Sequence, residues 1–215
     1  MPSLRTLVAD DHPLVAEALA MASRVAAPEY VVDAVGSIAA AEALARERRG
    51  YRLVLLDLML PDARGFSGFL RLQHVLGNVS IVIVTAHRRP ELVEAARALG
   101  AAGFLSKSQP LDELARAIRE VVAGRHVFPS TAADDGGAKT AMGKIATLSG
   151  AQLRVLLALA DGRLNKQIAG DLGVTEATVK AHLTAIFRKL EVTNRTQALL
   201  AMQPLLGEER GSEHS

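Results

Sequence analysis

The chain has 215 residues, of which 49% are hydrophobic, 3% aromatic and 22% charged, and its formal net charge is +2. It contains no cysteine, which excludes disulfide bonds, a thiolate nucleophile and a cysteine-ligated zinc site. No stretch approaches the roughly 20 uncharged residues that cross a bilayer, and the N-terminus has no small-residue cleavage site. We therefore expect a cytoplasmic globular protein without a membrane partner, built as one large domain or two of roughly 100 residues.

The first 125 residues alternate between short apolar runs and longer segments with helical spacing. The runs predicted as strands are 4–9, 30–35, 53–56, 81–84 and 103–105. The segments predicted as helices are 13–26, 38–48, 65–76, 91–99 and 111–123. Because crossover connections are right-handed, five such units predict an α/β fold in which helices cover both faces of a parallel sheet. We assign residues 1–127 to this domain.

The pattern changes after this domain. Residues 128–145 include Asp134-Asp135-Gly136-Gly137, which is typical of a flexible linker. Four helical segments follow at 152–160, 165–172, 176–190 and 194–202, predicting a small all-α four-helix domain over 146–205 and a disordered tail over 206–215. Residues 144–203 have eight Lys/Arg against four Asp/Glu, so this part of the chain is basic.

Polar side chains follow the predicted strands of the first domain. Asp10 and Asp11 end the first strand, Asp57 ends the third, Thr85 ends the fourth, and Lys107 follows the fifth. Because the carboxyl ends of parallel strands lie at one edge of a sheet, we expect these side chains to meet there. An Asp-Asp pair by itself is more often a turn or a helix cap, so the prediction depends on the joint occurrence.

Carboxylates close together repel one another unless a cation is present. Mg²⁺ prefers oxygen ligands and is usually held by one or two carboxylates and several waters. We expect Asp11 and Asp57 to bind Mg²⁺ directly, Asp10 to act through water, and the main-chain carbonyl of Met59 to complete the protein ligands.

The same pocket has the groups that phosphoryl transfer requires. Asp57 is the expected phosphoacceptor, and Lys107 and the metal would offset the charge on the transferred oxygens. The Thr85 hydroxyl would donate a hydrogen bond to a phosphoryl oxygen. Its inward movement would leave space for an aromatic side chain, and Phe104 is the candidate.

These residues resemble the receiver domain of two-component response regulators over about residues 3–125. The matching positions are Asp10, Asp11, Asp57, Met59-Leu60-Pro61, Gly65, Thr85-Ala86 and Lys107. The resemblance implies a flavodoxin-like sheet of order 2-1-3-4-5, a sensor histidine kinase as phosphodonor, slow self-dephosphorylation, and a lifetime tuned by Met59 and His87. Ser108, where many receivers have proline, and Phe104, which lacks a tyrosine hydroxyl, depart from the pattern.

An enzyme is the competing interpretation. Phosphatases of the haloacid dehalogenase type also have an aspartate nucleophile after an apolar strand, and they resemble one another in a second aspartate two positions later. Met59 occupies that position here. We therefore do not expect an enzyme, apart from slow loss of the acquired phosphoryl group.

In the second domain, the predicted helix 176–190 is amphipathic. Its apolar face comprises Val179, Leu183, Ile186, Phe187 and Leu190. Its polar face is basic and comprises Thr178, Lys180, Ala181, Thr184, Arg188 and Lys189. Gly173 and Thr175 are typical of the end of one helix and the N-cap of the next, so they predict a tight helix-turn-helix.

Residues 148–202 resemble the LuxR-type helix-turn-helix, and the whole chain resembles a NarL/FixJ-type response regulator. By this resemblance Lys180, Ala181 and Thr184 would read bases in the major groove of double-stranded DNA. Contacts to phosphate or sugar are expected from Asn165, Lys166, Thr178, His182, Arg188 and Lys189. Alternatively, His182 is an ordinary half-buried histidine, and Arg188 and Lys189 are a solvated helix end.

The domain begins with Leu148-Ser149-Gly150-Ala151-Gln152, where relatives usually have Leu-Thr-Pro-Arg-Glu. Ser149 and Gln152 can still form a capping box, so a helix should start there. Ala198, Leu199, Leu200 and Met202 on the last helix could pair in a homodimer.

We therefore predict a DNA-binding transcriptional response regulator of a two-component system, switched by phosphorylation of Asp57. The alternative is a phosphorylation-independent DNA-binding regulator whose receiver is vestigial.

Overall fold

The computed structural model describes residues 4–63, 65–87, 89–129, 144–145 and 147–202. The chain divides into two compact units, residues 1–131 and 132–215. Most of the predicted linker and the whole predicted tail lie outside the described residues.

The first unit contains a five-stranded parallel sheet of order β2-β1-β3-β4-β5, which confirms the predicted flavodoxin-like fold. Its strands are β1 (Arg5–Ala9), β2 (Val31–Val35), β3 (Tyr51–Leu56), β4 (Ser80–Thr85) and β5 (Gly103–Ser106). Its helices are α1 (Pro13–Ala26), α2 (Ile38–Glu47), α3 (Ser67–Leu76), α4 (Pro90–Leu99) and α5 (Leu111–Val122).

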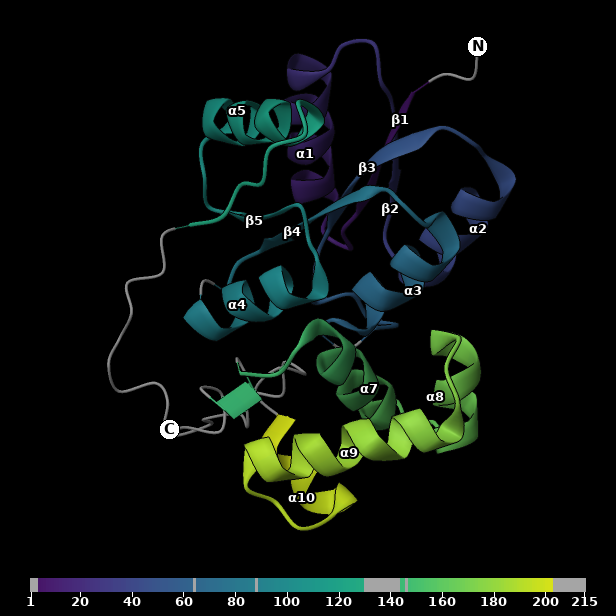
Figure 1. The fold of residues 1–215 in the computed structure, drawn as a ribbon. Helices are drawn as coiled ribbons and strands as arrows, with labels where there is room; N and C mark the ends of the chain where they lie inside the picture. The colour runs from purple at the N-terminus through teal and green to yellow at the C-terminus, as the bar shows by residue number, and fades with distance from the viewer. Residues whose placement is uncertain (1–3, 64, 88, 130–143, 146, 203–215) are drawn as a thin grey trace, which may run out of the picture. The chain divides into compact units, whose positions relative to one another are not determined.

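The helices cover both faces of the sheet, with α1 and α5 on one face and α2, α3 and α4 on the other (Figure 1). Alternate residues of the strands, such as Val8, Leu55 and Val84, pack with Leu19 of α1 and Ile118 of α5 in one buried cluster. The intervening strand residues are buried as well, as expected for a parallel sheet whose two faces are both covered. This packing fixes the strand ends that form the candidate site.

Two features of the first unit extend beyond the predicted elements. β3 begins at Tyr51, two residues earlier than predicted, and the Tyr51 hydroxyl donates a 2.7 Å hydrogen bond to Asp33 of β2. After α5, Val127 forms a parallel bridge with Gly103, and its carbonyl accepts a 2.8 Å hydrogen bond from Phe104 N. The segment that leaves α5 is thereby attached to the edge strand of the sheet.

The second unit has the four predicted helices, α7 (Gly150–Ala160), α8 (Asn165–Leu172), α9 (Glu176–Leu190) and α10 (Arg195–Met202). The Ser149 hydroxyl accepts from Gln152 N at 3.3 Å, and Gln152 Oε1 accepts from Ser149 N at 3.0 Å, which confirms the predicted capping box. Gly173 ends α8 with a φ of 65°, and Thr175 caps α9.

The described residues include no helix with both the length and the apolar character that a membrane crossing needs.

Candidate functional site

The structure brings Asp10, Asp57 and Lys107 together at the carboxyl edge of the sheet. Lys107 Nζ lies 2.7 Å from Asp57 Oδ2 and 2.7 Å from Asp10 Oδ2. Both aspartates are 3% exposed, and each follows a strand whose neighbours keep it in place, since Asp10 N donates to Val35 O and Asp57 N donates to Ala9 O. One ammonium group therefore bridges two buried carboxylates that lie far apart in the sequence.

Asp11 and His12 form the more exposed side of this acid cluster. His12 Nδ1 lies 2.8 Å from Asp11 Oδ1 and 3.3 Å from Asp10 Oδ1, and the His12 main-chain N–H donates to Asp10 Oδ1 at 2.9 Å. His12 is not among the pocket residues predicted from the sequence. Its place directly after the acid pair was the available signal.

The charges around Lys107 change the pKa of its ammonium group. Burial by itself would lower the pKa of the Lys107 ammonium, but the close contacts of this ammonium with the Asp10 and Asp57 carboxylates outweigh burial and raise the pKa above its ordinary value. Lys107 is therefore a permanent cation at neutral pH. With three carboxylates and one ammonium, the cluster has an excess of negative charge.

The cluster fits a divalent cation. One ligand atom from each of Asp10, Asp11, His12 and Asp57 lies within 4.8 Å of the others. Among the described residues, Asp57 Oδ1 has no hydrogen-bond partner, and Asp10 Oδ2 makes no hydrogen bond with suitable angles although it lies close to Lys107. Buried carboxylate oxygens without donors are costly unless a cation offsets them, and hard oxygen donors suit Mg²⁺.

The remaining predicted pocket residues lie on or soon after strands β3, β4 and β5. Thr85 is 1% exposed at the end of β4, and its hydroxyl accepts a 3.3 Å hydrogen bond from the main-chain N–H of His87. Phe104 of β5 is 2% exposed. Met59, two residues after Asp57, has a side chain that is 43% exposed, and His87 is exposed as well.

Helix α9 of the second unit presents the predicted polar face to solvent. Lys180, Ala181, Thr184 and Arg188 are exposed, whereas Val179, Leu183, Ile186 and Leu190 are buried. Lys180 Nζ lies 3.3 Å from Glu176 Oε1, an exposed pair that costs little to separate. The Thr184 hydroxyl donates to Lys180 O at 3.1 Å, so it is satisfied within the helix.

Other predicted DNA contacts are less accessible. Asn165, Thr178 and His182 are half-buried, and Lys166 is exposed. Lys189 Nζ donates to Thr147 O at 2.8 Å and to Gln152 Oε1 at 2.9 Å, which ties the end of α9 to the start of α7. This bonding gives Lys189 a structural role that the sequence analysis did not predict.

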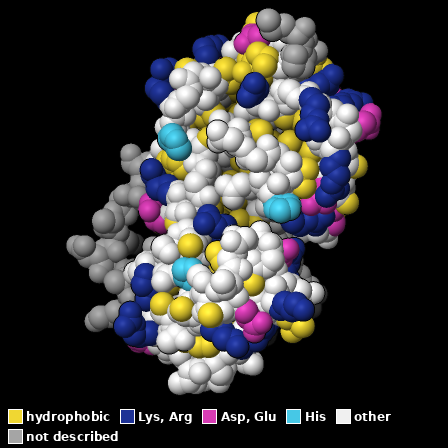
Figure 2. Space-filling model, turned by 45° about the vertical axis from the view of Figure 1, so that its right-hand side comes forward, with side chains coloured by type: hydrophobic (Ala, Val, Ile, Leu, Met, Phe, Trp, Pro, Cys, Tyr) yellow, Lys and Arg dark blue, Asp and Glu magenta, His cyan; other side chains and the backbone are white. Residues whose placement is uncertain are grey.

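On the face drawn in Figure 2, charge by itself does not locate a binding surface. In Figure 2, Lys and Arg side chains are spread over the visible face of both units and do not gather in one patch. The division of α9 into a buried apolar face and an exposed polar face is a more specific indication of a binding surface than charge.

Comparison with known proteins gives two family matches. Residues 6–119 match the response regulator receiver domain, and residues 146–202 match the bacterial regulatory proteins of the luxR family. The glycerol metabolism activator of Pseudomonas putida is 35% identical over 207 residues, covering 92% of this chain and 94% of that protein. The transcriptional regulatory protein UhpA of Escherichia coli K12 is 33% identical, covering 86% and 90%.

A solved structure of RcsB from Salmonella enterica serovar Typhimurium, bound to promoter P1flhDC in the presence of phosphomimetic BeF3⁻, has a similar fold. Its TM-score is 0.56 at 20% identity, with 93% of this chain and 98% of that chain covered. This likeness supports the fold, and the family matches and relatives support the function. The chain is a response regulator of a two-component system, a DNA-binding transcription regulator in which a receiver domain precedes a LuxR-type helix-turn-helix domain.

Proposed function

We propose that Asp57 accepts a phosphoryl group from a sensor histidine kinase and that this modification controls DNA binding. The observation that carries the proposal is the environment of the Asp57 carboxylate, which is buried, bonded to Lys107 through one oxygen, and without a hydrogen-bond partner for the other among the described residues. An acceptor oxygen with free lone pairs beside a fixed cation suits phosphoryl transfer, which depends on positioning and charge compensation.

In the proposed reaction, an Asp57 oxygen attacks phosphorus as the bond from phosphorus to the kinase imidazole nitrogen breaks. The imidazole leaves with the electron pair of that bond, and an acyl phosphate remains on Asp57. Lys107 stays charged throughout, because its raised pKa lies far above neutrality, and it offsets the charge on the transferred oxygens.

Mg²⁺ is the proposed cofactor, held by Asp11, Asp57 and the main-chain carbonyl of Met59 directly and by Asp10 through water. When bound, the ion would neutralise charge on the phosphoryl oxygens. One ligand atom from each of Asp10, Asp11 and Asp57 lies within 4.8 Å of the others, so these side chains are close enough to share one ion.

Thr85 and Phe104 are the proposed switch. The strand register pairs Ile83 with Phe104 and Thr85 with Ser106, so Thr85 and Phe104 are diagonal neighbours on one face of the sheet. A phosphoryl group on Asp57 would attract the Thr85 hydroxyl as a donor in place of its present bond from His87 N. The displaced Thr85 leaves space that the Phe104 ring can enter.

The proposed output is a homodimer that reads DNA through α9 of each copy. Lys180, Ala181 and Thr184 are the proposed base-reading residues. The exposed Lys166 and Arg188 would contact phosphates. The half-buried residues Asn165, Thr178, His182 and Lys189 would also contact phosphates. In this proposal residues 1–127 and 146–205 are the functional domains and 128–145 the linker. Bacterial chromosomal DNA as the target implies action in the cytoplasm.

Intact mass tests the proposal. Incubation with Mg²⁺ and acetyl phosphate should add one phosphoryl group to the wild-type chain and none to Asp57→Asn. On removal of the donor, the added mass should disappear slowly as water attacks the acyl phosphate, and substitutions of the exposed Met59 and His87 should change this rate. Equal addition to Asp57→Asn would refute Asp57 as the acceptor. No addition to either protein, together with unchanged DNA binding, would favour the vestigial receiver.

A further inference from the structure

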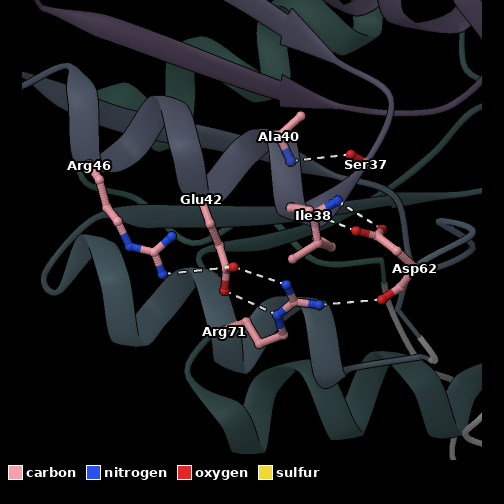
Figure 3. A network of polar contacts seen from close by, with 8 residues as sticks. Ser37, Ile38, Ala40, Glu42, Arg46, Asp62 and Arg71 are labelled. Atoms are coloured by element: carbon pink, nitrogen blue, oxygen red, sulfur yellow. Dashed lines mark hydrogen bonds and ion pairs between the residues drawn. The ribbon is translucent and has the colours of Figure 1, made fainter.

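Asp62 lies in the loop between β3 and α3, the same loop that follows Asp57, yet its carboxylate binds another element. Its Oδ1 accepts a 2.9 Å hydrogen bond from Ile38 N, and its Oδ2 accepts a 2.8 Å bond from Ala39 N. These are the first two residues of α2 (Figure 3). A residue 24 positions away therefore satisfies two N–H groups that the helix itself leaves without acceptors.

A second connection joins the same two elements. Arg71 of α3 donates from Nη1 to the Asp62 main-chain oxygen at 3.3 Å. The same guanidinium forms a two-point bond with Glu42 of α2, at 3.0 Å from Nε and 2.9 Å from Nη2 (Figure 3). Bonds of this forked kind fix orientation as well as distance. The loop, α2 and α3 are thus joined by charged hydrogen bonds.

The end of α2 that Asp62 caps lies against the acid pair. A Cβ placed on Gly36, which precedes the Ser37 N-cap, would lie 3.6 Å from Asp11 Cα and 3.9 Å from Asp10 O. The turn before α2 therefore packs on the main chain of the acid pair. Through Asp62, this turn is also tied to the loop that contains Met59.

Within that loop, Leu58 and Leu60 are each 3% exposed, but Met59 between them is 43% exposed. The Met59 side chain therefore does little to hold its own main chain in place. Ala63 N donates to Leu60 O at 3.2 Å, so the loop turns directly after Leu60 and brings Asp62 to α2. Fixing Asp62 therefore fixes the far end of a short segment that begins at Asp57.

We propose that Asp62 is a positioning residue of the phosphorylation pocket. By capping α2 it holds the loop after Asp57 against the turn that supports Asp10 and Asp11, and so keeps the main chain at Met59 and the acid pair in the arrangement that binds Mg²⁺. This inference rests on the proposed function of Asp57. According to this inference, the affinity of the pocket for Mg²⁺ depends partly on Asp62, a carboxylate outside the acid cluster.

Ser37 provides a matched control. Its hydroxyl accepts a 3.2 Å hydrogen bond from Ala40 N (Figure 3), so it caps the same helix as Asp62. Ser37 directly precedes α2 in the chain and does not belong to the loop after Asp57. Removing either cap weakens α2 by a similar mechanism, but only removal of the Asp62 side chain breaks the two direct bonds between the loop and α2.

The experiment compares wild type, Asp62→Ala, Asp62→Asn and Ser37→Ala as full-length proteins. Calorimetric titration with Mg²⁺ should give a dissociation constant about tenfold weaker for Asp62→Ala, in the range found when groups supporting metal ligands are removed. Ser37→Ala should bind Mg²⁺ as wild type does. Asp62→Asn keeps one acceptor oxygen and should fall between wild type and Asp62→Ala.

Two further measurements separate positioning from general stability. Hydrogen exchange of the amides of residues 58–60, 62 and 63 should be faster in Asp62→Ala and unchanged in Ser37→Ala, while unfolding midpoints should fall in both. Equal Mg²⁺ affinity in wild type and Asp62→Ala would overturn the inference, as would an equal loss of affinity in Ser37→Ala. Failure of the wild-type protein to bind Mg²⁺ or to accept a phosphoryl group would instead refute the proposed function.

Discussion

At the scale of single residues, Lys107 offsets only part of the charge of the pocket. Its ammonium contacts Asp10 and Asp57, whereas the Asp11 carboxylate is paired with the imidazole of His12. Carboxylates within a few ångströms repel one another. A bound cation would offset this repulsion, which is the role proposed for Mg²⁺ at this site.

We expect Asp11→Asn to raise the free energy of unfolding in the absence of Mg²⁺, because it removes one of the three repelling carboxylates. In the wild type, Mg²⁺ at about 100 times its dissociation constant should add about 2.7 kcal/mol to the free energy of unfolding. Asp11→Asn should lose most of this increase. Urea unfolding with and without Mg²⁺ measures both effects, and Glu17→Gln, on the exposed side of α1, should behave as wild type. An undiminished Mg²⁺ effect in Asp11→Asn would remove Asp11 from the ligand set.

Lys180 and Lys166 are both exposed lysines of the second unit, on α9 and α8 respectively, but the proposal gives them different roles. Lys180→Ala should weaken specific binding by about 1–3 kcal/mol and relax the preference at one base pair. Lys166→Ala should weaken binding to all sequences alike and reduce the salt slope by about one. A binding selection combined with a salt titration distinguishes the two. An unchanged sequence preference in Lys180→Ala would exclude base reading by that side chain.

The sequence predicts the position of a pocket residue when that residue comes at the end of a strand. Asp10, Asp57 and Lys107 follow apolar runs, and parallel pairing brings the ends of these runs together. Asp62 was not predictable in this way, because its partners are two main-chain amides of a different helix. Nothing in the local sequence indicates such a contact.

At the scale of elements, the chain after α5 is attached to the edge of the sheet. Val127 bridges to Gly103, and Arg97 of α4 lies over the ring of Phe128, 4.1 Å from its centroid. An unpaired edge strand exposes main-chain donors and acceptors. The segment around Val127 satisfies part of this edge on β5, the strand that also contains Phe104.

Gly103→Ala tests how closely this segment approaches the sheet. A Cβ at position 103 would lie 2.8 Å from the main-chain oxygen of Val127, so something must shift. We expect the free energy of unfolding of the receiver to fall by about 1–3 kcal/mol, as for other overpacked sites. Calorimetry should record this loss, and hydrogen exchange at Phe104 N, which donates to Val127 O, should become faster.

Gly170 of α8 is the matched control for this substitution. A Cβ on Gly170 would meet nothing within 4 Å, and alanine has the higher helix propensity. Gly170→Ala should therefore stabilise its own domain by about 0.5–1 kcal/mol. Unchanged stability in Gly103→Ala would show that the Val127 segment does not remain on the strand in solution.

Elements were predictable where their signals are local. The Ser149–Gln152 capping box and the turn at Gly173 depend on residues three or four positions apart, and both are confirmed. The bridge at Val127 was missed because a segment this short has no periodicity. Its partner strand lies more than 20 residues away in the sequence, so only tertiary structure reveals the pairing.

At the scale of the whole molecule, the proposed function couples the pocket of the receiver domain to a helix in another domain that is proposed to read DNA. A change from mostly inactive to mostly active needs a differential free energy of several kcal/mol between the two states. The proposed dimerisation would be one source of this free energy, because two recognition helices bind paired half-sites more tightly than one. The expected dimer contact is on α10.

Burial within the domain limits which α10 residues of the predicted stripe could meet a second copy. Ala198 and Met202 are fully buried within their own domain, Leu199 is half-buried, and Leu200 is 55% exposed. An apolar stripe on a helix commonly packs into the core of its own domain, and most residues of this stripe do so. Leu200 is therefore the residue of the predicted stripe that is most available to a second copy.

We expect Leu200→Ser to weaken dimerisation of the phosphorylated protein without lowering its stability, because an exposed side chain contributes little to the core. Binding to DNA with two half-sites about one helical turn apart, roughly 34 Å, should weaken, whereas binding to one half-site should not change. Sedimentation and binding assays on both DNAs measure these effects. Leu164→Ser, which alters a 65% exposed leucine next to α8, should leave the dimer intact. Equal loss on both DNAs would place Leu200 in the DNA contact and not in the dimer.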